Sequence, residues 1–160
     1  MSQNGQPASV LIVDDEDMVI TSIKAFLQLE TDFKVYGFND PEEASLFAAD
    51  HAVDVAVSDY LMPKMNGIEL LGRIKELQPE ASRVLLTGHA DKQSAIQAIN
   101  QAMLFQYLEK PWDNSQFLLV IRGGVERAQL FRELRDKVDA LDHANSRIKT
   151  VQRRLMEAFL

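Results

Sequence analysis

Short apolar runs recur along the first two thirds of the chain, and segments with helical spacing separate them. The runs have the length and the β-branched or aromatic content of strands, and they are VLIV (10–13), FKVYGF (33–38), VDVAVS (53–58), RVLLT (83–87) and FQYLE (105–109). The separating segments place apolar residues on one helix face: Val19, Ile23, Phe26 and Leu27; Ala44, Phe47 and Ala48; Ile68, Leu71, Ile74 and Leu77; Ala95, Ile96 and Ile99. This alternation predicts an α/β fold, with a five-stranded parallel sheet covered by helices on both faces.

Two of the connections carry recognisable local signals. Asp40 followed by Pro41 predicts a helix start, and Glu43 stands three residues after Asp40 as in a capping box. After the third run, Pro63 fixes one φ angle, and we expect Gly67 to adopt a φ angle that other residues resist. Both segments should therefore be tight connections between a strand and a helix.

Polar side chains follow four of the five predicted strands. Asp14 and Asp15 follow the first run. Asp59 follows the third run, Thr87 is the last residue of the fourth, and Lys110 follows the fifth. In a sheet of this kind ligands bind beyond the carboxyl ends of the strands. Three carboxylates at one edge would repel each other unless a hard divalent cation lies among them, and oxygen-only ligands favour Mg²⁺. An ammonium and a hydroxyl can bind phosphoryl oxygens, so these residues match phosphoryl transfer with Asp59 as the nucleophile.

Ordinary interpretations exist for each of these residues alone. An aspartate at a strand end is usually a solvated turn residue, and Asp14-Asp15 can cap the next helix. Two other functions also use related chemistry. A Mg²⁺-dependent phosphatase of the haloacid dehalogenase type would want a second aspartate two residues after Asp59, where Leu61 stands. A flavodoxin-like cofactor binder would need a phosphate-binding loop where Asp14, Asp15 and Glu16 would repel the anion.

The motifs LIVDDED (11–17), VSDYLMPKMNGIELL (57–71), LLTGHA (85–90) and YLEKPW (107–112) follow one another at a specific spacing. In this order they resemble the CheY-like receiver domain of two-component response regulators, over about Val10 to Val120. The resemblance implies a flavodoxin-like (βα)5 fold with strand order 2-1-3-4-5. It also implies Mg²⁺ held by Asp15, Asp59 and the backbone carbonyl of Leu61, with Asp14 acting largely through water.

The same resemblance implies a signalling role. Asp59 would take a phosphoryl group from a phosphohistidine on a sensor histidine kinase or phosphotransfer protein, with Lys110 and Thr87 binding its oxygens. Thr87 and Tyr107 would then switch conformation. The domain would be a phosphoacceptor and not an enzyme, acting on an output domain or, alternatively, as a stand-alone receiver through protein–protein interaction.

Charge is distributed unevenly along the chain, whose net charge is −7. From Arg122 onward there are nine Lys and Arg residues against six Asp and Glu residues, so the preceding part is strongly acidic. Acidic surface argues against nucleic acid binding, which needs clustered basic residues. There is no cysteine, no secretory leader pattern and no apolar run long enough for a membrane helix. We therefore expect a cytoplasmic protein without nucleic acid or membrane partners.

The last part of the chain predicts one long helix. No proline occurs from Asn114 to Leu160, and the pair Gly123-Gly124 is the one helix-weakening feature. In a heptad register, the d positions are Leu134, Leu141, Ile148 and Leu155, and the a positions are Phe131, Val138, Asn145, Gln152 and Phe159. An asparagine at an a position favours a parallel, in-register homodimer over 125–160. The alternative is a single amphipathic helix that folds back on its own domain.

These patterns divide the chain into three expected parts. Residues 1–8 should be a disordered tail, 9–124 a receiver domain, and 125–160 a coiled-coil linker. Since the helix stays apolar to its last residues, LMEAFL, we expect an output domain to follow it.

Overall fold

The computed structural model describes residues 5–91, 93–97 and 103–159. Its elements are β1 (Ser9–Val13), α1 (Asp17–Glu30), β2 (Lys34–Phe38), α2 (Pro41–Asp50), β3 (Val55–Asp59), α3 (Gly67–Leu77), β4 (Ser82–Thr87), the short 3₁₀ turn η1 (His89–Asp91), β5 (Gln106–Glu109) and α5 (Asn114–Phe159). Residues 93–97 are also helical, as the spacing of Ala95 and Ile96 predicts, whereas Ile99 lies outside the described residues.

The five strands form one parallel sheet in the order β2-β1-β3-β4-β5, which confirms the predicted flavodoxin-like topology. Neighbouring strands are in register near their carboxyl ends. Val13 of β1 pairs with Ser58 of β3, Asp59 pairs with Leu86 of β4, and Thr87 pairs with Glu109 of β5. The residues that follow these strands therefore emerge at the same edge of the sheet.

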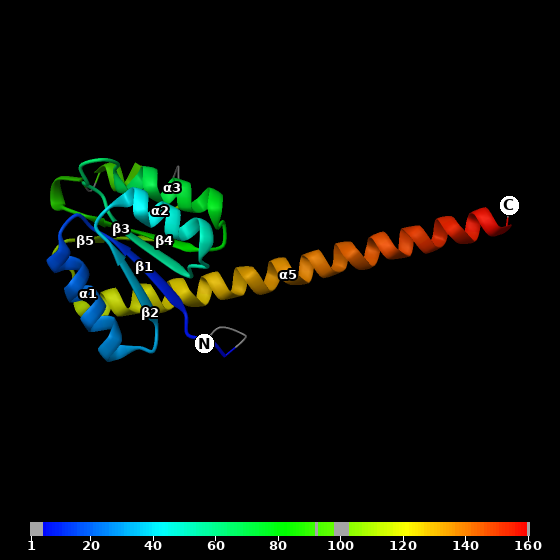
Figure 1. The fold of residues 1–160 in the computed structure, drawn as a ribbon, viewed down its shortest axis with the longest axis horizontal. Helices are drawn as coiled ribbons and strands as arrows, with labels where there is room; N and C mark the ends of the chain where they lie inside the picture. Colours follow the sequence, from blue (N-terminus) through cyan, green and yellow to red (C-terminus); the bar gives the residue numbers. More distant parts are fainter. Residues whose placement is uncertain (1–4, 92, 98–102, 160) are drawn as a thin grey trace. The chain divides into compact units, whose positions relative to one another are not determined.

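Helices cover both faces of the sheet, as predicted (Figure 1). Successive residues of a strand point to opposite faces. Leu11 and Val13 of β1 join the apolar cluster beneath α2 and α3, and Val10 and Ile12 join the cluster beneath α1 and α5. Phe117 on α5 is fully buried there. The sheet is thus enclosed, and its carboxyl edge is left open for polar residues.

Side chains cap the starts of α2 and α3 next to this edge, whereas α1 has no side-chain cap. Asp40 precedes α2, and its carboxylate accepts a hydrogen bond from the Glu42 N–H. Asn66 precedes α3, and its side-chain oxygen accepts from the Glu69 N–H. The predicted start at Asp40-Pro41 is confirmed, and both caps satisfy backbone donors that the first helical turn cannot pair internally.

The expectation for the φ angle of Gly67 is wrong, because positive φ angles among the described residues occur at Gly5 and Met103. Gly67 is the first residue of α3, and its N–H donates to the Tyr60 carbonyl. A Cβ atom at this position would overlap the carbonyl oxygen of Asp59 and lie 2.9 Å from Leu85 Cδ1. Glycine is therefore needed because α3 begins against the backbone of Asp59.

Gly123 and Gly124 do not interrupt α5, which is continuous across them. A Cβ atom on Gly124 would lie 3.0 Å from Val55 Cγ2 and 3.3 Å from Ser82 Cβ. The Gly124 carbonyl accepts a 2.6 Å hydrogen bond from the Ser82 hydroxyl. Gly124 therefore lets α5 pack closely on the sheet, whereas the sequence indicated only that the glycine pair weakens the helix.

The chain divides into two compact units, Met1–Gln129 and Leu130–Leu160. Val125 and Ala128 on α5 are buried within the first unit. The second unit is helical through Phe159, and the large apolar side chains along it are exposed: Leu130, Phe131, Leu134, Val138, Leu141, Ile148, Val151, Leu155, Met156 and Phe159. Across the described parts of the chain, every helix falls short of the length or apolar character that a membrane span requires.

Two glycines of α3 allow a direct test of the contact with Asp59. Replacing Gly67→Ala should lower the free energy of unfolding by about 1–3 kcal/mol, because the methyl group is forced against backbone atoms. Replacing Gly72→Ala should raise it by about 0.5–1 kcal/mol, since nothing lies within 4 Å of a Cβ there and alanine favours the helix. Urea unfolding of both variants measures the difference. Equal effects at the two positions would contradict the close-approach explanation.

Candidate functional site

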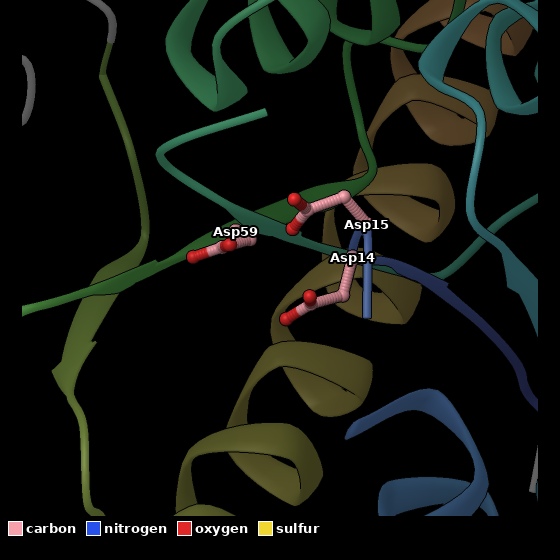
Figure 2. A group of neighbouring side chains, drawn as sticks. All are labelled: Asp14, Asp15 and Asp59. Atoms are coloured by element: carbon pink, nitrogen blue, oxygen red, sulfur yellow. The ribbon is translucent and has the colours of Figure 1, made fainter. Parts of the chain in front are cut away.

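Three carboxylates meet at the carboxyl edge of the sheet. Asp14 and Asp15 follow β1, and Asp59 is the last residue of β3. One carboxylate oxygen from each lies within 4.8 Å of the others, and Figure 2 shows the three carboxyl groups on the same side of the strand ends. Asp14 and Asp59 are buried, whereas Asp15 is exposed. The sequence prediction that these three residues come together is confirmed by their positions.

Lys110 supplies the opposite charge. Its ammonium nitrogen lies 3.2 Å from Asp14 Oδ2 and 3.2 Å from Asp59 Oδ1. Lys110 follows β5, and its N–H donates a 2.7 Å hydrogen bond to the Thr87 carbonyl, which ties it to the end of β4. One ammonium is therefore shared by two carboxylates, and the four charged groups together carry a net charge of −2.

Backbone groups fix the two buried carboxylates. Asp14 Oδ1 accepts a 2.9 Å hydrogen bond from the Glu16 N–H, and Asp59 Oδ1 accepts a 3.0 Å hydrogen bond from the Tyr60 N–H. The hydroxyl of buried Ser58 donates to the Asp59 carbonyl at 3.0 Å. These bonds hold the side chains in place while the charges repel each other.

Burial raises the pKa of Asp14, although the Glu16 N–H and Lys110 partly offset this rise. Burial also raises the pKa of Asp59, and the neighbouring charge of Asp14 raises it further, against the effect of Lys110. Burial would by itself lower the pKa of Lys110, but the charges of Asp14 and Asp59 raise it overall. The charged forms of Asp14 and Asp59 are thus destabilised, and the protonated form of Lys110 is stabilised.

The donor set fits a hard divalent cation. It consists of carboxylate oxygens alone, and a dipositive ion among them would offset the burial of charge and the repulsion that raise the pKa values of Asp14 and Asp59. No histidine or thiolate is part of this group, so its chemistry favours Mg²⁺ over softer metals.

The remaining predicted residues lie around this cluster. Thr87 is buried at the end of β4, and its hydroxyl oxygen lies 3.5 Å from the Leu108 carbonyl oxygen. Tyr107 pairs in register with Leu85 and packs, partly buried, against the cluster beneath α2 and α3. Leu61 follows β3 by two residues with an exposed side chain. The structure thus brings Asp14, Asp15, Asp59 and Lys110 into one group and places the other three residues beside it.

An ion pair at the border of the site was missed by sequence reasoning. Lys64 Nζ lies 3.0 Å from Asp40 Oδ2, which links the loop after β3 to the start of α2. A cavity of about 330 Å³ next to it is lined by Asp15, Asn39, Asp40, Pro41, Pro63 and Lys64. Both charged residues sit in loops, where no periodic pattern signals a partner. Their pairing could be found only once the two connections were placed side by side.

Comparison with known proteins gives a consistent result. The family model described as "Response regulator receiver domain" matches residues 10–122. The crystal structure of adenylate cyclase from Rhodopirellula baltica is similar at 25% identity, covering 84% of this chain and 98% of that chain with a TM-score of 0.79. The signal receiver domain of an HD domain-containing protein from Pseudomonas fluorescens is similar at 30% identity, covering 77% and 98% with a TM-score of 0.71.

Curated relatives are longer than this chain. The transcriptional regulatory protein FixJ from Rhizobium meliloti is 34% identical over 91% of this chain and 69% of its own length. The hydrogenase transcriptional regulatory protein HoxA from Cupriavidus necator is 31% identical over 74% of this chain and 24% of its own length. The chain spans about a quarter of the length of several such relatives.

The burial of Asp59 and the neighbouring charge of Asp14 predict a pH-dependent gain of stability in Asp59→Asn. Because the folded-state pKa of Asp59 is raised above 3.8, this carboxyl favours folding most at low pH, and its contribution is lost as the pH rises through the folded-state pKa. In metal-free buffer at pH 7 the variant should therefore melt at a higher temperature than the wild type. The gap should narrow as the pH falls toward 3.8.

Thermal unfolding at several pH values measures this gap, with the exposed loop variant Asp32→Asn as the control. A wild type that is at least as stable as Asp59→Asn at pH 7 would show that Lys110 fully offsets the burial of the Asp59 charge and its repulsion from Asp14.

Proposed function

The chain belongs to the response regulator receiver domain family of two-component systems, and from this premise we propose that Asp59 accepts a phosphoryl group from a sensor histidine kinase or a phosphotransfer protein. The observation that carries the proposal is the position of Lys110, whose ammonium lies 3.2 Å from both Asp14 and Asp59 beside the exposed carboxylate of Asp15. This arrangement places the nucleophilic carboxylate of Asp59 next to an ammonium group and two further carboxylates.

Asp15, Asp59 and the backbone carbonyl of Leu61 would hold Mg²⁺, with Asp14 contributing largely through water. The ion would neutralise charge on the carboxylates and on the phosphoryl oxygens. This proposal is supported by the oxygen-only donor set and by the repulsion between Asp14 and Asp59.

In the transfer step, a carboxylate oxygen of Asp59 attacks the phosphorus atom of phosphohistidine. The new O–P bond gives an acyl phosphate, the N–P bond breaks, and the departing imidazole nitrogen takes up a proton. The Lys110 ammonium, already 3.2 Å from Asp59 Oδ1, would pair with one phosphoryl oxygen. The Thr87 hydroxyl would donate to another.

A conformational switch would follow from the movement of Thr87. Its hydroxyl now lies 3.5 Å from the Leu108 carbonyl oxygen on β5, a long contact that a phosphoryl oxygen can replace. Movement of Thr87 toward the site would leave room into which the partly buried ring of Tyr107 turns. A local charge change would thereby alter the surface formed by β5 and α5.

We further propose that the domain is a signalling switch and not an enzyme, that it acts in the cytoplasm, and that its partners are proteins and not nucleic acid or membrane. Relatives are named as transcriptional regulators, and similar structures carry the names adenylate cyclase and HD domain-containing protein. These activities differ, so the receiver fold does not select an output. A stand-alone receiver that acts by binding a protein is the alternative.

Within the predicted segment 125–160, residues 130–160 would join two copies as a parallel coiled coil, because Val125 and Ala128 are buried within the first unit. The support is the exposed apolar stripe of the second unit, together with Lys137 at a g position and Asp142 at the following e position, which attract each other across a parallel pair.

Phosphorylation of the full chain tests the acceptor directly. With Mg²⁺ and acetyl phosphate, the wild type should gain one phosphoryl group by intact-mass analysis, and Asp59→Asn should gain none because its side chain cannot form the acyl phosphate. Asp32→Asn serves as the matched control and should behave as the wild type. An equal adduct on Asp59→Asn would identify another acceptor, and catalytic turnover of the donor without an adduct would favour the phosphatase.

The switch is tested by amide chemical shifts on addition of a beryllofluoride mimic with Mg²⁺. In the wild type, shifts should extend from the acidic cluster to Tyr107 and the rest of β5. In Thr87→Ala they should stay near the cluster, because the hydroxyl that couples it to β5 is missing, whereas Thr21→Ala on α1 should respond as the wild type. Shifts at Tyr107 that are unchanged in Thr87→Ala would contradict the role of Thr87.

A further inference from the structure

Beside the a and d columns that define its heptads, the helix of the second unit carries a third column, g, that is apolar except for one lysine. The g column consists of Leu130, Lys137, Ala144, Val151 and Ala158. Val151 and Leu130 are 53% and 59% exposed, much like the d-position residue Leu155 at 52%. The apolar stripe is therefore wider than the a and d columns that a two-stranded coil needs.

The d column is shared by two alternative seams, one formed with the a column and one with the g column. The a/d seam is apolar from Phe131 to Leu141, but its next two a positions are Asn145 and Gln152. The d/g seam has the opposite character: Lys137 interrupts it early, and it is apolar from Leu141 onward. Each seam is thus interrupted by polar side chains where the other is continuous.

We propose that two copies of this helix pair through the a/d seam up to Leu141 and through the d/g seam from Ala144 onward. The proposal rests on the parallel dimer of the proposed function and specifies how it is built. The resulting core would follow the chain at spacings of three or four residues without a polar member: Phe131, Leu134, Val138, Leu141, Ala144, Ile148, Val151, Leu155 and Ala158.

The change of seam falls at Val138–Leu141–Ala144, where two spacings of three follow each other. An extra spacing of three overwinds a coiled coil locally. Against this cost, the d/g seam removes the amide layers of Asn145 and Gln152 from the core and buries Val151, which the a/d seam leaves at its edge.

A second copy of the chain fits this surface better than a different protein does. In the first half, valine at an a position with leucine at d positions favours two strands, and Lys137 and Asp142 are complementary between copies. Because neighbouring columns differ by about 50° at 3.5 residues per turn, the change of seam turns each helix by that angle. The stretch from Ala144 to Ala158 therefore faces its partner with a different side of the helix from the stretch that ends at Leu141.

Single cysteines report which column faces the partner, since the native chain has none. The full chain is oxidised mildly, and disulfide-linked dimer is followed on non-reducing gels. Adjacent positions form matched pairs: Val138→Cys against Lys137→Cys in the first half, and Val151→Cys against Gln152→Cys in the second. His143→Cys, on the opposite helix face, gives the background rate.

Val138→Cys and Val151→Cys should cross-link roughly tenfold faster than their neighbours, because residues of a core column face their own copy in a parallel pair. A further pair, Ala144→Cys and Asn145→Cys, repeats the comparison made in the second half of the helix. Because alanine is small, replacing Ala144 leaves the core volume almost unchanged. Sedimentation equilibrium of each reduced variant shows whether it is dimeric.

The outcomes separate the change of seam from the dimer itself. If Gln152→Cys and Asn145→Cys react faster than Val151→Cys and Ala144→Cys, or equally fast, the change of seam is wrong, while a fast Val138→Cys still supports the parallel dimer. If all variants react at the His143→Cys rate, the parallel dimer is wrong, and the change of seam fails with it.

Discussion

The ammonium of Lys110, shared between the carboxylates of Asp14 and Asp59, is the interaction on which the site depends. Without it, two buried carboxylates would face each other at the edge of the sheet next to a third. Lys110 offsets only part of the effect of burying these charges side by side, since the pKa values of both aspartates remain raised. The folded domain is therefore prepared for added positive charge, and in the proposed function Mg²⁺ supplies it.

The parallel sheet explains why these groups meet. Its strands end in register, so that residues distant in sequence emerge at one edge, and the helices on both faces leave that edge accessible. Local packing then fixes the acceptor. Gly67 allows α3 to begin against the Asp59 carbonyl, while Tyr60 and Ser58 hold the residue by hydrogen bonds. Similarly, Gly124 allows α5 to lie against Ser82, so the helix that continues into the second unit is anchored on the sheet.

The fold and the acidic cluster could be predicted because their signals are periodic or positional. Alternating strand and helix patterns predicted the sheet, and the aspartates at strand ends predicted where charges meet. The reason why glycine is needed at position 67 could not be predicted. A turn with a positive φ angle and a close approach of α3 to the Asp59 backbone both require a glycine, so the sequence looks the same in either case. The Lys64–Asp40 pair was missed for a related reason, since two loops distant in sequence show no sign of being neighbours. The packing role of Gly124 likewise depends on its contact with Ser82 and Val55.

Binding of Mg²⁺ to the unphosphorylated protein shows directly whether the acidic edge of the sheet accepts a cation. Titration calorimetry, with the fluorescence of the single tryptophan, Trp112, as a second signal two residues from Lys110, measures the affinity. We expect one saturable site whose dissociation constant rises at least about tenfold, or about 1.4 kcal/mol, in Asp15→Asn and in Asp59→Asn, but stays unchanged in Asp32→Asn. Equal Mg²⁺ affinity in all four proteins would contradict this expectation.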